Sequence, residues 1–125
     1  MSRRGIELGR YAEDMAVRFL RKNGYKILER NYKSVFGEID VIAKDGESTV
    51  FVEIKSRSSP LFGPPYLRVT KRKKENIIKS AISYLKRYGL IDRECRIDVV
   101  SISLDEEPYS IELIKDAFGT EGRWL

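Results

Sequence analysis

Three acidic residues and one lysine stand at alternate positions of two neighbouring segments, and together they could bind a divalent metal ion. Glu38 and Asp40 belong to the first segment, and Glu53 and Lys55 belong to the second. Between the segments, Asp45-Gly46 is a strong signal for a two-residue turn, which predicts a β-hairpin. Because side chains alternate along a strand, we expect all four to project from one face of the hairpin.

The turn at Asp45-Gly46 also predicts the register of the hairpin. It places a set of apolar side chains on the face opposite the acids, where they would meet a core. The expected pairs are Lys44 with Glu47, Asp40 with Phe51, and Glu38 with Glu53, and the expected core residues are Ile39, Val41, Val50, Val52 and Ile54.

Carboxylates gathered on so small a patch repel one another, and Asp and Glu are poor strand formers. A divalent cation would reverse the sign of that interaction. Mg²⁺ prefers one or two carboxylates together with waters and phosphate oxygens. A lysine beside such a site can orient the attacking water or stabilise charge on the phosphate. The alternative is a half-exposed hairpin, in which apolar and charged residues alternate without any site.

The composition restricts the chemistry that this chain can perform. The sequence has 125 residues, of which 42% are hydrophobic and 34% charged, and we interpret residues 1–125 as a single globular domain. It contains no histidine, which excludes Ser-His-Asp and Cys-His hydrolases and histidine-ligated zinc sites. Phosphate loops of the Walker type and dinucleotide fingerprints are also absent from the sequence. An enzyme of this composition would have to use carboxylates, lysines, arginines, tyrosines or a metal.

The charge and the single cysteine indicate where the protein works and what it could bind. Cys95 cannot form an internal disulfide, so we expect a reducing cytoplasm. No apolar run approaches the roughly 20 residues of a membrane span, and no signal-peptide hydrophobic region follows the basic N-terminus. The net charge of +5 is compatible with nucleic acid, although many proteins of this charge bind nothing acidic.

Hydrophobic spacing predicts the elements that position the acids. Residues 8–23 form a helix that Gly24 can end, and residues 25–32, 37–43 and 49–55 form three strands. Residues 58–67 contain three of the four prolines and form a loop. Thr70 can cap a second helix over residues 70–88, a strand follows at 96–104, and residues 109–114 could add another. This order predicts an α/β domain with a mixed central sheet flanked by helices.

A cluster of cations lies at the start of the second predicted helix. Cations at a helix N-terminus oppose the helix dipole, and a nucleic-acid backbone placed there would meet both lysines and free backbone N–H groups. Tyr66, Tyr84 and Tyr88 could stack on bases or pack at the edge of the helix. The cluster, which we expect to bind nucleic acid, comprises Arg68, Lys71, Arg72, Lys73 and Lys74.

Two further side chains, those of Asp98 and Trp124, have possible roles outside the acid cluster. Asp98 lies on a strand pattern and is interpreted as structural, paired with Arg96 or with a lysine of a neighbouring strand. Trp124 could anchor a tail or form a dimer contact.

The two segments of the hairpin resemble the signature of the PD-(D/E)XK nuclease superfamily. More closely, the chain resembles the YraN-type family of small, functionally uncharacterised bacterial proteins, which are related to Holliday-junction resolvases. The matches are ordered along nearly the whole sequence. They comprise Gly9, Glu13-Asp14-Met15-Ala16, Gly24-Tyr25, Asn31-Tyr32, Gly37-Glu38-Ile39-Asp40, Phe51 to Arg57, Val69-Thr70, Lys73, Arg96 to Val100, and Ile114 to Phe118.

This resemblance implies a restriction-endonuclease-like fold and specific roles for the matched residues. Asp40 and Glu53 match the metal-binding acids, Ile54 would add its backbone carbonyl, and Lys55 matches the catalytic lysine. Glu13 falls where many members bring an acidic residue from the first helix, as an outer-shell or second metal ligand, although it could equally be a solvated helix charge. Lys74 is a departure, since members often carry glutamine there.

The resemblance implies a magnesium- or manganese-dependent phosphodiesterase, endonuclease-like, acting on DNA. Resolvase-like relatives imply branched DNA and a homodimer. Two alternatives from other classes remain open at this stage. One is a non-catalytic nucleic-acid-binding module on a nuclease fold, and the other is a protein–protein adaptor that uses the sheet edge or the Trp124 tail.

Overall fold

The computed structural model describes residues 3–119, and its side chains from Glu7 onward. In that range the elements follow the predicted order of helix, three strands, helix and two strands, and the last strand, which the sequence left open, is present. Trp124 lies outside the described residues. The helices are α1 (Arg3–Lys22) and α2 (Lys71–Arg87), and the strands are β1 (Lys26–Ser34), β2 (Gly37–Asp45), β3 (Ser48–Arg57), β4 (Cys95–Ser103) and β5 (Ser110–Phe118).

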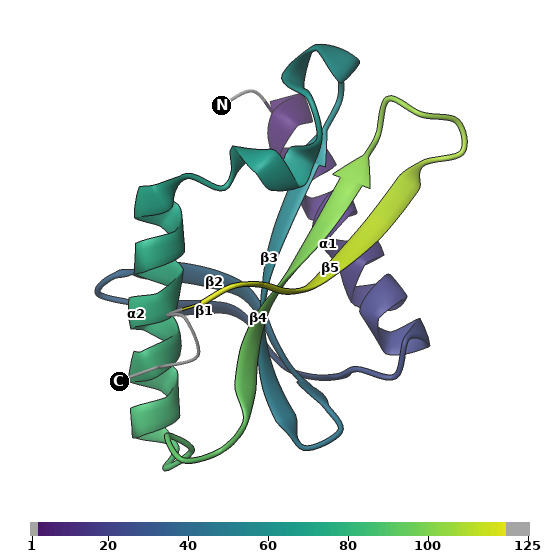
Figure 1. Ribbon diagram of the computed structural model, residues 1–125. Helices are drawn as coiled ribbons and strands as arrows, with labels where there is room; N and C mark the ends of the chain where they lie inside the picture. The colour runs from purple at the N-terminus through teal and green to yellow at the C-terminus, as the bar shows by residue number, and fades with distance from the viewer. Residues whose placement is uncertain (1–2, 120–125) are drawn as a thin grey trace.

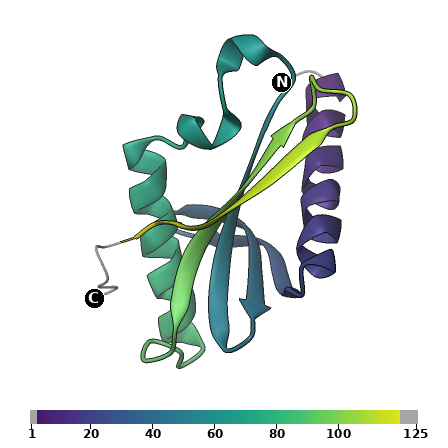
Figure 2. The same cartoon turned by 45° about the vertical axis from the view of Figure 1, so that its right-hand side comes forward.

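One five-stranded sheet with the order β1-β2-β3-β4-β5 forms the centre of the molecule (Figure 1). β3 and β4 run parallel, whereas the other neighbouring strands are antiparallel, so the predicted mixed sheet is confirmed. A parallel pair needs a crossover connection between its two strands, and α2 supplies it. α1 and α2 lie on opposite sides of the sheet (Figure 2).

Local backbone signals account for the helix ends. The side chain of Thr70 accepts a hydrogen bond from the N–H of Lys73 at 3.2 Å and so caps α2 as predicted. α1 begins at Arg3, earlier than predicted. At its other end Gly24 has a φ of +87°, which glycine adopts without a steric penalty, and the N–H of Tyr25 returns to the carbonyl of Leu20 at 3.0 Å.

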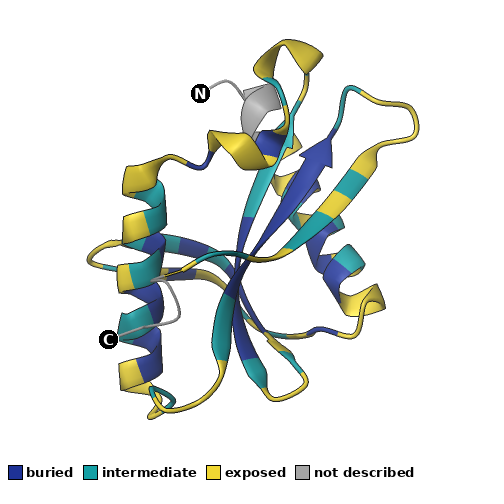
Figure 3. Ribbon diagram, in the orientation of Figure 1, coloured by how far each residue is buried: buried dark blue, intermediate teal, exposed yellow. Residues whose placement is uncertain are grey.

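Both faces of the central strands are buried (Figure 3). β3 is therefore covered on both sides, which explains its nearly continuous run of apolar residues. The acidic face of the hairpin is also covered at Glu53, which a half-exposed hairpin would leave in water, while the metal site itself stays a prediction. On the α1 face Ala12, Ala16 and Leu20 pack with Val41, Val50, Val52 and Val100, and on the α2 face Ile77, Ala81 and Leu85 pack with Ile42, Phe51 and Ile97.

The β2–β3 turn lies one residue later than predicted. Asp45 pairs with Ser48, so the two-residue loop is Gly46-Glu47, and Gly46 has a φ of +61°. A turn that needs positive φ only at its first central position favours glycine there, which explains the shift. The predicted pairs of Lys44 with Glu47, Asp40 with Phe51, and Glu38 with Glu53 are therefore wrong; Lys44 faces Thr49, Ile42 faces Phe51, and the ladder ends where Val41 faces Val52.

Each expected partner moves by two residues, so the side chains keep the faces that the alternation predicted. Ile39 is an exception, because it packs with Tyr32 in the core beneath α2 instead of joining Val41 on the α1 face. β2 separates from β3 before Val41, and beyond that point the β1–β2 ribbon curves beside α2 (Figure 1). In β1, Asn31 adopts a left-handed φ of +55°.

Asp98 is completely buried and fully paired, which confirms its structural interpretation. It accepts hydrogen bonds from the hydroxyl of Tyr25 at 2.7 Å, from Nε of Arg96 at 3.0 Å and from the backbone N–H of Asp116 at 2.9 Å. Burial and the bond to Asp98 raise the pKa of Tyr25. Burial alone would lower the pKa of Arg96, but its hydrogen bonds to Asp98 and Asp45 raise it. This network joins β4 and β5 to the start of β1.

Candidate active site

Asp40 lies where β2 and β3 separate, one position beyond the last pair of their ladder. Its Oδ2 accepts a hydrogen bond from the backbone N–H of Ile54 at 2.8 Å. The carboxylate thus takes the place of a strand partner for an N–H that the ladder no longer pairs. As a result, Asp40 is held beside the segment of β3 that carries Glu53 and Lys55.

Glu53 is the unusual side chain of this region, because a carboxylate is rarely so buried. Only 3% of the residue is exposed, and its Oε2 atom has no hydrogen-bond partner among the described residues. The other oxygen, Oε1, lies 3.8 Å from the ammonium of Lys55 and 3.8 Å from that of Lys73. A buried oxygen without a partner costs free energy, so its presence calls for an explanation.

Burial and mutual repulsion shift both carboxylates in the same direction. Burial, followed by the negative charge of Asp40, raises the pKa of Glu53 to about 8, with Lys73 and Lys55 opposing the shift. Burial likewise raises the pKa of Asp40, against the hydrogen bond from Ile54 and the charge of Lys73. The pair therefore resists simultaneous ionisation, and a nearby cation would favour the doubly charged form.

Lys73 contributes directly to the acid pair, which the sequence did not reveal. We expected it to contact a phosphate backbone as one of five clustered cations, but its ammonium lies as close to Glu53 as that of Lys55. The helical spacing of Lys73 relative to the buried residues of α2 could have predicted this contact. Lys73 stands one helical turn before Ile77 and two before Ala81, and both of these are buried against the sheet. A cation on that stripe must point toward β2 and β3.

Glu13 and Glu38 lie at the edge of the site. Oε1 of Glu13 accepts hydrogen bonds from Arg30 at 3.1 Å and from the side chain of Asn31 at 3.1 Å. The charges of Glu13 and Glu38 both contribute to the raised pKa of Asp40, so the two acids face the same region. Among the described side chains, no three acidic or cysteine residues come close enough to form a ready-made metal cage. The ligand role of Glu13 therefore stays a prediction.

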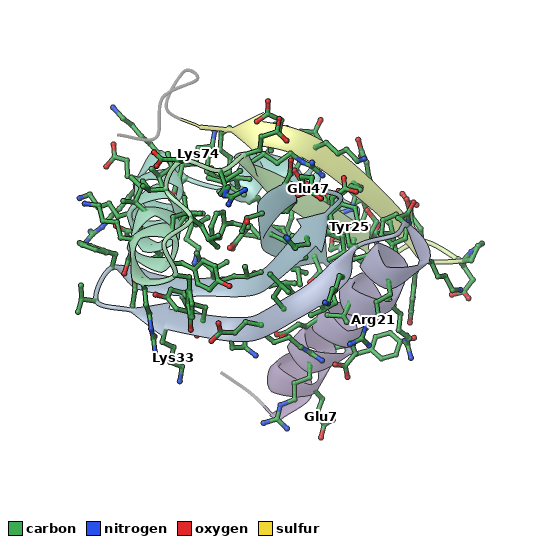
Figure 4. The ribbon with its side chains drawn as sticks, turned by 90° about the horizontal axis from the view of Figure 1, so that it is seen from below. Glu7, Arg21, Tyr25, Lys33, Glu47 and Lys74 are labelled. Atoms are coloured by element: carbon green, nitrogen blue, oxygen red, sulfur yellow. The ribbon has the colours of Figure 1, made fainter. Side chains whose placement is uncertain are left out.

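The rest of the basic cluster divides into separate environments. Arg68 donates a hydrogen bond to the carbonyl of Ser56 at 3.1 Å and lies over the ring of Phe62. Lys74 lies over the ring of Phe118, at the point where the end of β5 meets α2 (Figure 4). Lys71 and Arg72 are exposed on the first turn of α2. These two remain available to a ligand in solution.

The three tyrosines proposed for base stacking also differ. Tyr84 is buried and packs edge-on against Tyr32 and Phe51, so it is a core residue. Tyr66 and Tyr88 are exposed residues, and the ring of Tyr88 lies against that of Tyr84.

The donors present fit a hard divalent cation. Asp40 and Glu53 offer carboxylate oxygens, which Mg²⁺ and Mn²⁺ prefer, and the partnerless Oε2 of Glu53 would gain a ligand in place of an unsatisfied position. Two carboxylates are as many as Mg²⁺ usually takes from a protein, because waters and substrate phosphates complete its shell. The carbonyl of Ile54, implied by the resemblance, would be a compatible third oxygen. Softer metals that need histidine or several thiolates are poor matches for this chain.

In the part of the chain that the structure describes, no helix is sufficiently long and apolar to span a membrane.

Comparison with known proteins places the chain in a family. The model of the family described as "Uncharacterised protein family UPF0102" matches residues 12–102. A UPF0102 protein of Syntrophus aciditrophicus is 48% identical over 113 residues, covering 90% of this chain and 89% of the relative. One from Geobacter metallireducens is 43% identical over 118 residues, covering 94% and 97%. The chain therefore belongs to the UPF0102 family, the YraN-type family that its motifs predicted.

Proposed function

We propose that this protein is a magnesium- or manganese-dependent phosphodiesterase that acts on DNA in the manner of an endonuclease, on the structural plan of the PD-(D/E)XK superfamily. The observation that carries the proposal is the buried carboxylate of Glu53. Among the described residues one of its oxygens has no hydrogen-bond partner, the other lies 3.8 Å from two lysines, and Asp40 stands beside it. Buried carboxylates with shifted pKa values gather at functional sites more than elsewhere, and a divalent cation would satisfy both acids at once.

Asp40 and Glu53 would hold the cation, with the carbonyl of Ile54 as a further oxygen. When bound, the cation would supply Lewis acidity toward a phosphate oxygen and lower the pKa of a coordinated water. Lys55, whose side chain is 26% exposed, has its ammonium 3.8 Å from Oε1 of Glu53 and would orient the attacking water or stabilise negative charge on the phosphate oxygens. Glu13 would support a bridging water from the first helix.

Cationic groups near the acid pair support a polyanionic substrate. The exposed Lys71 and Arg72 stand at the N-terminal turn of α2, where free backbone N–H groups also favour phosphate. Arg68 lies beside the end of β3 and is held there by Ser56. A phosphodiester bound across this end of α2 would lie next to Lys73 and the carboxylates. Branched DNA and a homodimeric assembly belong to the same proposal through the resemblance to resolvases.

A cleavage assay tests the proposal directly. Linear duplex, single-stranded and four-way-junction DNA would be incubated with Mg²⁺ or Mn²⁺ and the wild-type protein, Asp40→Asn or Lys55→Ala. Lys44→Ala is the matched lysine control, since Lys44 is exposed at the far end of the same hairpin. We expect metal-dependent cleavage that falls at least about a hundredfold in the first two variants and is unchanged in the third.

Two other outcomes would replace the proposal. Salt-sensitive DNA binding without cleavage of any substrate would indicate a binding module built on this fold. Absence of both cleavage and salt-dependent DNA affinity would favour a protein–protein adaptor. Comparing the cleavage of the three substrates gives the preferred DNA shape. Sedimentation of the active protein shows whether it is a homodimer.

A further inference from the structure

A pocket of about 550 Å³ lies on α2, away from the acid pair. Along the helix, Ile82, one of the pocket's lining residues, stands nine residues beyond Lys73, which corresponds to about 14 Å at the α-helical rise. Phe36, on the β1–β2 turn, lines one side of the pocket. The ribbon shows that this turn passes beside α2 (Figures 1 and 4). The described residues that line the pocket are Phe36, Lys79, Ile82, Ser83, Lys86 and Arg87.

One hydrogen bond to α2 and two within the β1–β2 turn hold this wall in place. The hydroxyl of Ser34 lies 2.7 Å from that of Ser80, which is buried on α2. The same Ser34 hydroxyl accepts the backbone N–H of Phe36 at 3.1 Å and lies 3.2 Å from the carbonyl oxygen of Gly37. The turn is therefore attached to the helix at the residue that orients Phe36. A ligand would meet an apolar wall that is already formed, which lowers the entropic cost of binding.

The rim of the pocket is cationic and not neutralised. Lys79 lies 5.8 Å from the centroid of the Phe36 ring, and Lys86 and Arg87 follow it on the same side of α2. Arg87 contacts the ring of Tyr88. In the described part of the chain none of these three cations forms an ion pair with a carboxylate. Three unpaired positive charges around an apolar hollow favour a ligand that is both acidic and apolar.

We propose that this pocket binds an acidic peptide segment of a partner protein, with one apolar side chain of the segment seated between Phe36 and Ile82 and its carboxylates on Lys79, Lys86 and Arg87. Charge complementarity selects an anion, and the concave apolar wall selects a side chain as its anchor. A nucleic-acid backbone is less well matched, because phosphates gain nothing from an apolar hollow. The proposal does not depend on nuclease activity, since the pocket shares no residue with the acid pair.

Fluorescence polarisation with a defined probe tests the proposal. The probe is a fluorescein-labelled heptapeptide of aspartates that carries one phenylalanine and one leucine. A second peptide replaces both apolar residues with glycine at the same charge, and an oligothymidylate of equal charge represents nucleic acid. All three would be titrated with the full-length wild-type protein in buffer containing EDTA.

A set of variants distinguishes binding in the pocket from non-specific attraction to a positively charged protein. Lys79→Glu combined with Lys86→Glu reverses the rim, and Phe36→Ala removes the wall. Lys26→Glu combined with Lys44→Glu makes the same change of net charge at the opposite end of the β1–β2 hairpin, where both lysines are exposed. Circular dichroism checks that each variant is folded.

We expect saturable binding of the apolar acidic peptide, weakened about tenfold or more by either pocket variant and less than about twofold by the hairpin control. Equal binding of the glycine peptide would overturn the proposal, since charge alone would then account for the affinity. Tighter binding of the oligothymidylate with the same variant losses would reassign the pocket to nucleic acid. Absence of peptide binding at millimolar protein would also overturn it.

Discussion

The carboxylate of Asp40 accepts the backbone N–H of Ile54 at 2.8 Å, so one side chain both ends the β2–β3 ladder and positions a charge beside Glu53. The two tasks have different chemical requirements. An amide oxygen can accept the same hydrogen bond, but only a carboxylate carries the negative charge that a metal ion needs. The structural and functional contributions of Asp40 are therefore separable by substitution.

Asp40→Asn should retain the fold and lose metal binding. Its amide oxygen still accepts the N–H of Ile54, and the loss of charge relieves Glu53 of a repulsive neighbour. In EDTA, urea denaturation should give a free energy of unfolding at least equal to that of the wild type. Asp40→Ala should lower it by about 1 kcal/mol, because the N–H then loses its partner. Calorimetric titration with Mn²⁺ should show binding to the wild type alone; binding that survives in Asp40→Asn would argue against this carboxylate as a ligand.

The stability of the metal-free protein should fall as pH rises through neutrality. The pKa of Glu53 is raised from its ordinary value of 4.5 to about 8, so the folded state binds more protons than the unfolded state between these values. Stability is then fully present below the unfolded pKa and is lost as pH rises through the folded one, with a slope of at most about 1.4 kcal/mol per pH unit for this one group.

Urea denaturation in EDTA across this range measures that slope. Glu53→Gln keeps the shape of the side chain but cannot ionise, so its stability should depend less on pH than that of the wild type. Addition of Mg²⁺ should reduce the fall in the wild type and leave Glu53→Gln unaffected. A wild-type profile as flat as that of Glu53→Gln would show that Glu53 ionises normally.

Lys73 should affect metal affinity and cleavage in opposite directions. Its ammonium lies near the acid pair and repels a metal ion bound there. Lys73→Ala removes this positive charge, so Mn²⁺ should bind more tightly. Cleavage should nevertheless fall by about tenfold or more, because a group able to stabilise the phosphate is lost. Calorimetry and the DNA assay measure the two effects.

Lys74→Ala is the matched control for that experiment, since Lys74 is the next residue and contacts Phe118 instead of the acids. It should change metal affinity by less than about twofold. Lys73→Arg should restore part of the activity. Weaker metal binding in Lys73→Ala together with unchanged cleavage would assign Lys73 a structural role only.

The buried network around Asp98 should contribute strongly to stability without affecting metal binding. Tyr25→Phe removes hydrogen bonds to Asp98 and Arg96 and should lower the free energy of unfolding by about 1–3 kcal/mol. Asp98→Asn removes one of the two carboxylates that pair with Arg96, with Asp45 remaining, and should cost about 1–3 kcal/mol. Tyr109→Phe, at an exposed tyrosine, is the control and should change little. Urea denaturation measures all three, and equal effects of Tyr25→Phe and Tyr109→Phe would contradict the assignment.

The sequence by itself determined the order of the elements and the face that carries the acids. Both depend on local periodicity, because a strand alternates its side chains every two residues and a helix repeats every 3.6. For this reason the prediction that Asp40 and Glu53 share a face stayed correct although the predicted register was wrong. The turn shifted each partner by two positions, which leaves the alternation of faces unchanged. The cap at Thr70 and the stop at Gly24 are likewise local and were predicted correctly.

Only the tertiary structure decided how far the acids are buried and which distant groups reach them. Glu53 is buried because distant parts of the chain pack over its face of the sheet. The apolar run from Val50 to Val52 indicated a covered strand, but the alternation from Glu53 to Lys55 is equally that of a solvated one. The approach of Lys73 to Glu53 joins residues twenty positions apart, and the bond between Ser34 and Ser80 joins residues still more distant. Such contacts depend on how the β1–β2 ribbon and α2 pack on one another, which is a property of the whole fold and not of any segment.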